Sequence, residues 1–238
     1  MKAVASRAVR VLLGTTQLGR LWDVPVIMDW SLKVYFWVMI VLVGAGWWEA
    51  STLPVLAVAY TSVLLHEFGH ILTARRFGVS TRQVSMFVFG GIAQLESRVE
   101  DPKKMFLVSV AGPLVNVGLA GLFFAIGFVF TIFEMEALNK ACMLIVLINS
   151  VLAVFNMLPL YPTDGGQVVM SLFRMAGMDR FKAVIVACWI SLFGAVLLGV
   201  FAIVQGALMI SLVAVFIILA SRQELKNTRA ARDLQVTS

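Results

Sequence analysis

Hydrophobic positions in this sequence form long uncharged runs instead of the amphipathic stretches of a soluble domain. A membrane span needs roughly 20 mostly apolar residues. The last uncharged run, residues 183–221, is long enough for two helices, and Gln205–Gly206 offers a break near its middle. The pattern therefore predicts six membrane helices, at residues 34–48, 53–72, 105–133 and 141–160, with two more within 183–221.

Two segments have the pattern of strands. Residues 83–95 are rich in β-branched and aromatic side chains and are centred on Gly90–Gly91, which predicts a β-hairpin. Residues 21–29 alternate weakly, as a short strand does. The predicted fold class is therefore an α-helical multi-pass membrane protein. It has about six transmembrane helices and a small membrane-associated β-hairpin or sheet on the cytoplasmic side.

The composition supports a membrane protein. Of all residues, 61% are hydrophobic and 13% are charged, whereas a soluble domain is about half apolar and a quarter charged. These values exclude a solvated globule and a disordered chain. The net charge of +6 is explained by topology, so no nucleic-acid partner is expected. Cys142 and Cys188 lie in predicted spans, and no structural disulfide is expected.

The basic residues set the predicted orientation. All but one of the 19 lysines and arginines fall on one side of the six-span arrangement, and Lys140 is the exception. The positive-inside rule makes that side cytoplasmic, so we expect a cell-membrane protein with both termini in the cytoplasm. Residues 1–20 lack a continuous apolar run, and no cleaved signal peptide is expected. We predict a single integral membrane domain, 1–238, comprising a cytoplasmic segment at 1–33, a membrane core at 34–221 and a cytoplasmic tail at 222–238.

The chemistry-bearing motif is His66-Glu67-x-x-His70, inside the second predicted span. Positions i and i+4 share one helix face, so both imidazoles can reach one zinc ion. Glu67 follows His66 directly and can act as a general base toward water at that ion. These are the chain's two histidines, and ionisable residues inside a span indicate a functional site. The motif therefore predicts a zinc hydrolase.

A catalytic zinc site needs a third protein ligand and an open fourth position. Asp164 is the candidate, because the second and fourth predicted helices both run toward the cytoplasm and end near His66 and Asp164 respectively. The alternative for Asp164 is a turn or cap residue before Gly165–Gly166.

Three asparagines lie inside the predicted spans. Asn156, two turns before Asp164, is a candidate donor to a developing oxyanion. The alternative for Asn156 is a hydrogen bond between helices. For Asn149 we favour such an interhelical bond, and Asn116 has either that role or a place in the site.

The motifs resemble those of the site-2 protease family, the intramembrane zinc metalloproteases. The His66–His70 segment resembles the family's first motif and Asn156–Gly166 its second, with supporting likeness in Gly112–Asn116 and Phe89–Gly91. The resemblance covers about residues 19–166. It implies that His66, His70 and Asp164 bind zinc and that Glu67 is the base. Thr163 departs from the pattern, because many relatives carry Leu there, and we expect this change to affect packing and not a metal ligand.

The predicted function is an intramembrane zinc endopeptidase that cleaves substrate spans near the cytoplasmic leaflet. The resemblance implies regulated intramembrane proteolysis. The expected partners are membrane proteins with a transmembrane helix, the lipid bilayer and regulatory membrane proteins. One alternative is a membrane metalloprotease of the prenyl-protein type, which uses a glutamate as third ligand; Glu96 and Glu100 are available. A second is a non-enzymatic adaptor or transporter with a structural metal, which does not need Glu67.

Overall fold

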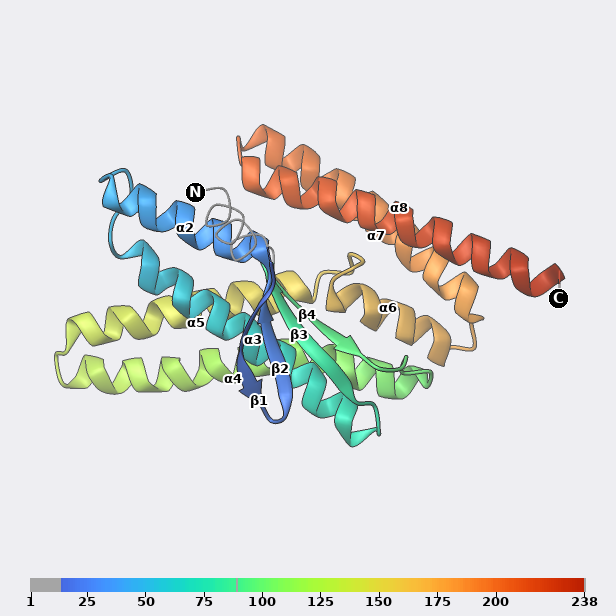
Figure 1. Cartoon of the computed structure of the whole chain (residues 1–238), viewed down its shortest axis with the longest axis horizontal. Coiled ribbons are helices and arrows are strands. Elements are labelled where there is room, and N and C mark those ends of the chain that lie inside the picture. The colour runs from blue at the N-terminus through green and yellow to red at the C-terminus, as the bar shows by residue number, and fades with distance from the viewer. Residues whose placement is uncertain (1–13, 89, 238) are drawn as a thin grey trace, which may run out of the picture. The chain divides into compact units, whose positions relative to one another are not determined.

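A computed structural model of the chain describes residues 14–88 and 90–237 (Figure 1). Phe89 and the basic residues Lys2, Arg7 and Arg10 of the charge pattern lie outside the described residues. The elements are β1 (Thr16–Leu21), β2 (Val24–Met28), α2 (Trp30–Gly44), α3 (Thr52–Arg76), β3 (Thr81–Phe87), β4 (Gly90–Leu95), α4 (Pro102–Ile132), α5 (Glu136–Asn156), α6 (Asp164–Met175), α7 (Arg180–Val204) and α8 (Leu208–Thr237).

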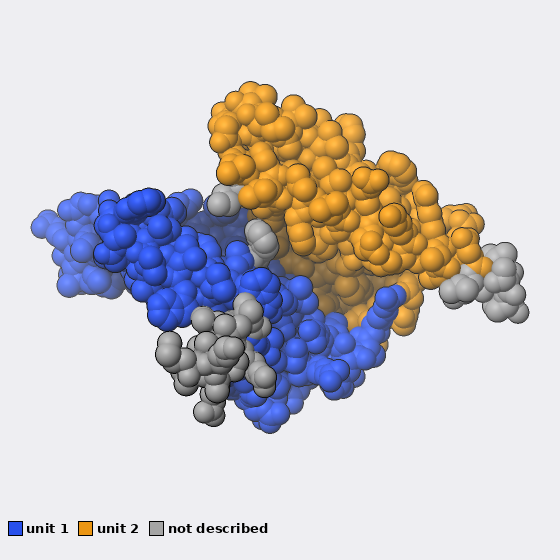
Figure 2. Space-filling model, turned by 45° about the horizontal axis from the view of Figure 1, so that its top comes forward, with its two compact units in different colours: residues 1–98, 114–152 blue, residues 99–113, 153–238 orange. Residues whose placement is uncertain are grey.

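The chain divides into two compact units, coloured blue and orange in Figure 2. The first comprises Met1–Arg98 and Leu114–Leu152. The second comprises Val99–Pro113 and Ala153–Ser238.

The described strands of the first unit form a four-stranded sheet in the order β1-β2-β3-β4. β1 pairs with β2 and β3 with β4 in antiparallel fashion, and β2 pairs with β3 in parallel. The strand predicted at 21–29 is wrong in its bounds, because the chain turns at Trp22 and Asp23, which have φ of 47° and 67°. A tight hairpin needs such left-handed residues. Trp is not a usual turn residue, so the alternation of apolar and polar residues over 21–29 gives no sign of the turn.

The predicted hairpin at 83–95 is present as β3 and β4, with its turn earlier than expected. β3 ends at Phe87 and β4 already begins at Gly90. The Gly90–Gly91 pair is therefore part of a strand and not the centre of the turn. Glycine inside a strand often marks a close approach of another group, and the site below shows which group approaches Gly91.

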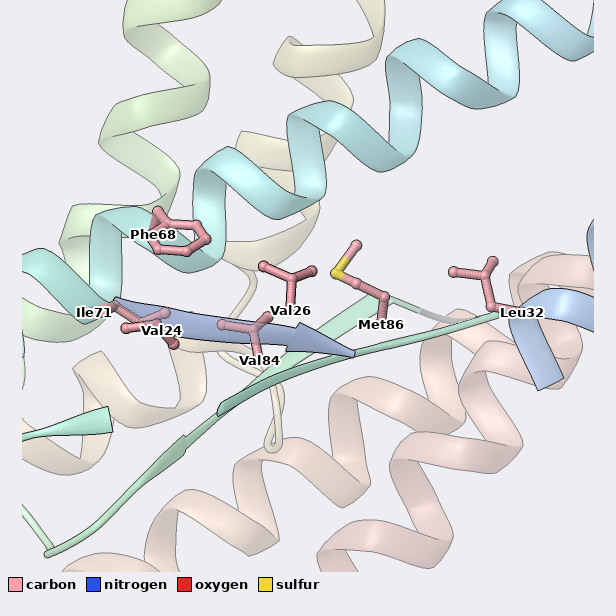
Figure 3. Packing of buried hydrophobic residues seen from close by; sticks show 7 residues of the cluster. All are labelled: Val24, Val26, Leu32, Phe68, Ile71, Val84 and Met86. Atoms are coloured by element: carbon pink, nitrogen blue, oxygen red, sulfur yellow. The ribbon is translucent and has the colours of Figure 1, made fainter. Parts of the chain in front are cut away.

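One face of the sheet packs on α3 and on the start of α2 (Figure 3). Val26, Val84 and Met86 of the strands and Phe68 and Ile71 of α3 are all at most 5% exposed. Burying side chains of this size stabilises the fold by roughly 1.5–3 kcal/mol each. Phe68 lies within the histidine motif and Ile71 directly follows it, so this packing fixes the helix that carries the motif.

Among the described residues, four helices are long and apolar enough to cross a membrane: α3, α4, α5 and α7. Together with the small sheet they make a mostly helical membrane protein, as the sequence predicted in coarse form. The predicted break at Gln205–Gly206 is confirmed, because α7 ends at Val204 and α8 begins at Leu208. Large apolar side chains such as Phe128 and Phe193 are more than 60% exposed, which suits contact with lipid.

The first four predicted spans differ from the observed helices by up to five residues at an end, and the fourth ends at Asn156 instead of Leu160. α2 ends at Gly44 instead of Trp48, followed by Gly46 in the left-handed region with φ of 73°. Asp164 begins a separate helix, α6, where the sequence predicted only a connection after the fourth span. The Gly165–Gly166 pair that follows is a poor helix former, which is why the start of α6 was missed.

Candidate metal centre

The histidine pair lies on α3, whose C-terminal end is well defined by the sequence. Arg75 and Arg76 lie in the last turn, where positive charge complements the helix dipole. Gly78, with φ of 79°, then closes the helix, and the N–H of Val79 donates to the Ala74 carbonyl. This pattern is a Schellman motif. The helix is thus 25 residues long and carries His66, Glu67 and His70 well inside its apolar stretch.

The two imidazoles meet on one face of α3. The Nε2 atoms of His66 and His70 are 3.1 Å apart, and the rings are nearly perpendicular at 83°. Two nitrogen ligands of a tetrahedral zinc ion, at about 2.0–2.1 Å from the metal, are about 3.3 Å apart. The pair therefore fits one shared zinc ion.

The tautomer of His66 is set by a buried asparagine on α4. His66 Nδ1 lies 2.6 Å from Asn116 Oδ1. An amide oxygen only accepts, so Nδ1 carries the proton and the Nε2 lone pair is left for a metal. His66 is 5% exposed and Asn116 is fully buried. A hydrogen bond of this kind to the other ring nitrogen orients a metal-bound histidine.

Asn116 is itself held by a chain of buried amides. Its Nδ2 donates to Asn149 Oδ1 on α5 at 2.9 Å. Asn149 Nδ2 then donates to Ser62 Oγ on α3 at 3.1 Å and to the Ile145 carbonyl at 2.9 Å. The interhelical role predicted for Asn149 is confirmed, and Asn116 combines an interhelical bond with a contact to the site. Sequence reasoning could not pair Asn116 with His66, because 50 residues separate them.

We expect Asn116→Leu to weaken zinc binding by about 10- to 100-fold, because the His66 ring loses the acceptor that fixes its tautomer. Asn149→Leu is the comparison variant. It removes the next amide in the chain but leaves the hydrogen bond between His66 and Asn116 possible. Titration against a zinc-binding dye measures both. Equal losses in the two variants would contradict a specific role for Asn116 and indicate that helix packing alone is affected.

Glu67 is held by β4. The N–H of Ala93 donates to Glu67 Oε2 at 3.1 Å. A Cβ placed at Gly91 would lie 2.6 Å from Glu67 Cγ, closer than real Cβ contacts allow. Glycine at 91 therefore lets the strand backbone lie directly against this side chain. The sequence signal for this contact is the Gly90–Gly91 pair, whose pattern predicts a turn, whereas the structure places it in β4.

The remaining candidates lie in the second unit. Asp164 is the first residue of α6 and is partly buried. Asn156 is the last residue of α5 and is also partly buried. The sequence predicts a ligand role for Asp164 and an oxyanion role for Asn156.

The alternative glutamate ligands are exposed. The Glu100 carboxylate accepts from Arg180 Nη1 at 3.2 Å, and Arg174 donates to the Glu100 carbonyl. Glu100 is thus bound to the start of α7 and the end of α6. Glu96 is exposed after the end of β4. These positions disfavour the glutamate-type site.

The fold and the site together define a membrane protein with a zinc-hydrolase type of centre. The profile of peptidase family M50 matches residues 54–141 and 132–201 of the sequence. The chain therefore belongs to peptidase family M50, the site-2 protease family, and the predicted resemblance is confirmed.

Curated relatives carry names of the same kind. The chain is 34% identical over 129 residues to a putative zinc metalloprotease, sll0528, of Synechocystis, covering 54% of this chain and 33% of that protein. It is 31% identical over 185 residues to the putative zinc metalloprotease Rip3 of Mycobacterium tuberculosis, covering 70% and 45%. The chain thus spans less than half the length of these relatives.

A solved structure shares the fold. The site-2 protease from Methanocaldococcus jannaschii matches 89% of this chain and 95% of its own, with a TM-score of 0.63 and 20% sequence identity. At this identity the likeness concerns the fold alone.

Proposed function

We propose that this chain is an intramembrane zinc endopeptidase that cleaves substrate spans near the cytoplasmic leaflet. The observation that carries the proposal is the His66–His70 pair, with its converging Nε2 atoms, on a helix long and apolar enough to span a membrane. Ionisable residues in such a helix are costly and are typically functional. Zinc binding and catalysis account for both histidines and for Glu67.

The proposed zinc ligands are His66, His70 and Asp164, each of which offers one ligand atom. Two imidazole nitrogens and one carboxylate oxygen are a usual donor set for catalytic zinc. When bound, zinc would supply Lewis acidity toward water and toward the substrate carbonyl. Three protein ligands leave the fourth position open for this chemistry.

The chain's own residues handle the protons. We assign Glu67 as the general base that takes a proton from the attacking water and returns it to the leaving amine. The Ala93 N–H keeps one Glu67 oxygen in place. We assign the Asn156 amide as a donor to the oxygen of the scissile carbonyl, which becomes negative during attack.

The proposed topology completes six spans with α2 and α8, leaving both termini in the cytoplasm and one membrane domain. α2 has 15 residues, about 22 Å at 1.5 Å per residue, and Trp47 and Trp48 after it suit an interface. α8 is apolar up to Ser221 and charged beyond it. A reporter fused after Ser238 that is active only outside the cytoplasm would contradict this topology.

The proposed substrates are membrane proteins with a transmembrane helix, cut to release a cytoplasmic fragment in regulated intramembrane proteolysis. The lipid bilayer is the medium of both enzyme and substrate. Regulatory membrane partners are proposed to control access, since the site lies within membrane helices. No nucleic-acid partner is proposed.

Zinc removal tests the activity directly. The full chain, reconstituted in lipid vesicles, is incubated with a panel of single-span substrates of about 20 apolar residues. We expect cleavage that stops on chelation and returns when zinc is added, with cuts mapped by mass spectrometry to the cytoplasmic half of the span. Cleavage that survives complete zinc removal, or cuts confined to segments outside the span, would contradict the proposal.

A further inference from the structure

The segment that leads to Asp164, residues 157–163 between α5 and α6, has an unusual set of backbone hydrogen bonds. Pro159 and Pro162 have no N–H to donate. The N–H groups of Leu160 and Thr163 donate to carbonyls of the same segment, those of Leu158 and Leu160 respectively. Buried backbone groups need hydrogen-bond partners. For the N–H and the carbonyl of Tyr161, these partners are side chains of α7 and α8.

Both main-chain groups of Tyr161 are bound by serines of the last two helices. The Tyr161 N–H donates to Ser191 Oγ on α7 at 2.6 Å. Ser221 Oγ on α8 donates to the Tyr161 carbonyl at 3.0 Å. Both serines are fully buried. Ser191 in turn donates to the Ala187 carbonyl one helical turn earlier, so its single proton is used.

Thr163 binds the same segment from within. It is the N-cap residue of α6, yet in the described part of the chain its side chain makes no capping hydrogen bond. Its hydroxyl instead shares its single proton between the carbonyls of Leu158 and Leu160, at 2.8 and 2.6 Å. Thr at this position therefore does more than fill space, because its hydroxyl makes a hydrogen bond to the segment that Leu cannot make.

Apolar and backbone contacts leave the segment little freedom. Leu160 is 5% exposed and packs with Ala195 of α7 and Ile217 of α8. The two helices α7 and α8 run side by side (Figure 1). A Cβ at Gly165 would overlap the carbonyls of Met157 and Leu158. The first turn of α6 therefore lies directly on the segment, and a movement of the segment displaces Asp164.

We propose that the hydroxyls of Thr163, Ser191 and Ser221, here called the hydroxyl clamp, position Asp164 for zinc. The clamp makes α7 and α8 part of the metal centre's support, although neither supplies a ligand. Ser221 lies beyond residues 54–201, where the family profile matches. This inference rests on the proposed role of Asp164 as third ligand, and the three serine and threonine residues are positioning residues.

Zinc affinity and a spectroscopic signature test the clamp. We would measure the zinc dissociation constant by competition with a chelating dye, and the visible spectrum of the cobalt-substituted protein, which reports coordination geometry. Two variants remove clamp hydroxyls: Thr163→Val and the double variant Ser191→Ala/Ser221→Ala. We expect each to bind zinc about 10-fold or more weakly and to alter the cobalt spectrum.

Two matched controls keep the measurement specific. Thr163→Ser retains the hydroxyl and is expected to keep wild-type affinity. Ser171→Ala removes a hydroxyl from α6 that is 1% exposed and that, among the described residues, has no hydrogen-bond partner. It is expected to leave zinc binding and the cobalt spectrum unchanged.

The outcomes separate the clamp from the proposed function. Wild-type zinc affinity and cobalt spectrum in folded Thr163→Val and in the double serine variant would overturn the clamp. If the double variant does not fold, Thr163→Val against Thr163→Ser decides alone. Asp164→Ala is measured in parallel. Unchanged zinc affinity in Asp164→Ala would overturn the third-ligand proposal, whereas loss in Asp164→Ala without loss in the clamp variants would overturn the clamp only.

Discussion

Glu67→Gln is expected to keep zinc bound and to lower the cleavage rate by at least about 100-fold, the lower end of what general acid–base catalysis contributes. Glutamine has nearly the shape of glutamate. In the wild type the Ala93 N–H donates to Glu67 Oε2 at 3.1 Å, and the amide oxygen of glutamine can still accept this hydrogen bond. It cannot take up a proton from water and return it to the leaving amine. The geometry of the site therefore survives while the proton transfer is lost.

The measurement pairs zinc content with the cleavage of a single-span substrate. Glu96→Gln is the matched control, because Glu96 is an exposed glutamate after β4 that has no proposed part in the reaction. Undiminished cleavage by Glu67→Gln would remove Glu67 as the base. Lost zinc in this variant would mean that Glu67 is a ligand. A cellular phenotype unaffected by Glu67→Gln would favour the adaptor or transporter.

Gly91→Ala is expected to lower cleavage by about 100-fold or more while zinc stays bound. The added methyl would lie 2.6 Å from Glu67 Cγ and 3.2 Å from Oε1, so either the carboxylate or β4 must move. A displacement of about 1 Å in a catalytic group can cost a factor of 100 in rate. His66 and Asn116 are held by the contacts among α3, α4 and α5, which the methyl does not touch.

Gly121→Ala provides the control for Gly91→Ala. Gly121 lies in α4, and a Cβ there meets no atom of the described chain within 4 Å. Activity comparable to wild type is expected for Gly121→Ala. If Gly91→Ala cleaves as fast as wild type, the contact between β4 and Glu67 has no part in catalysis. If it loses zinc, the strand supports the ligands as well as the base.

Local spacing accounts for the part of the site that the sequence predicted. His66 and His70 are one helical turn apart, so their shared face follows from helix geometry alone. The long uncharged runs likewise follow from the length that a membrane requires. These features depend on residues close in sequence, and they needed no knowledge of the tertiary fold.

Features that depend on distant residues were missed or misplaced. The bond between His66 and Asn116 joins α3 to α4, and the bonds of Tyr161 join its segment to α7 and α8. No periodicity in the sequence connects such positions. The Gly90–Gly91 pair was interpreted as a turn because glycine serves both in turns and at close approaches, and only the contact with Glu67 separates the two roles.

The most direct test of the account is the amount of zinc bound per chain in purified wild type and in Asp164→Ala, measured side by side. It requires no knowledge of the substrate. We expect about one zinc ion per chain in the wild type and a sharp fall in the variant, as a site with three protein ligands requires. Zinc unchanged in Asp164→Ala would place the third ligand elsewhere. A folded wild type that binds no zinc would contradict the zinc endopeptidase itself.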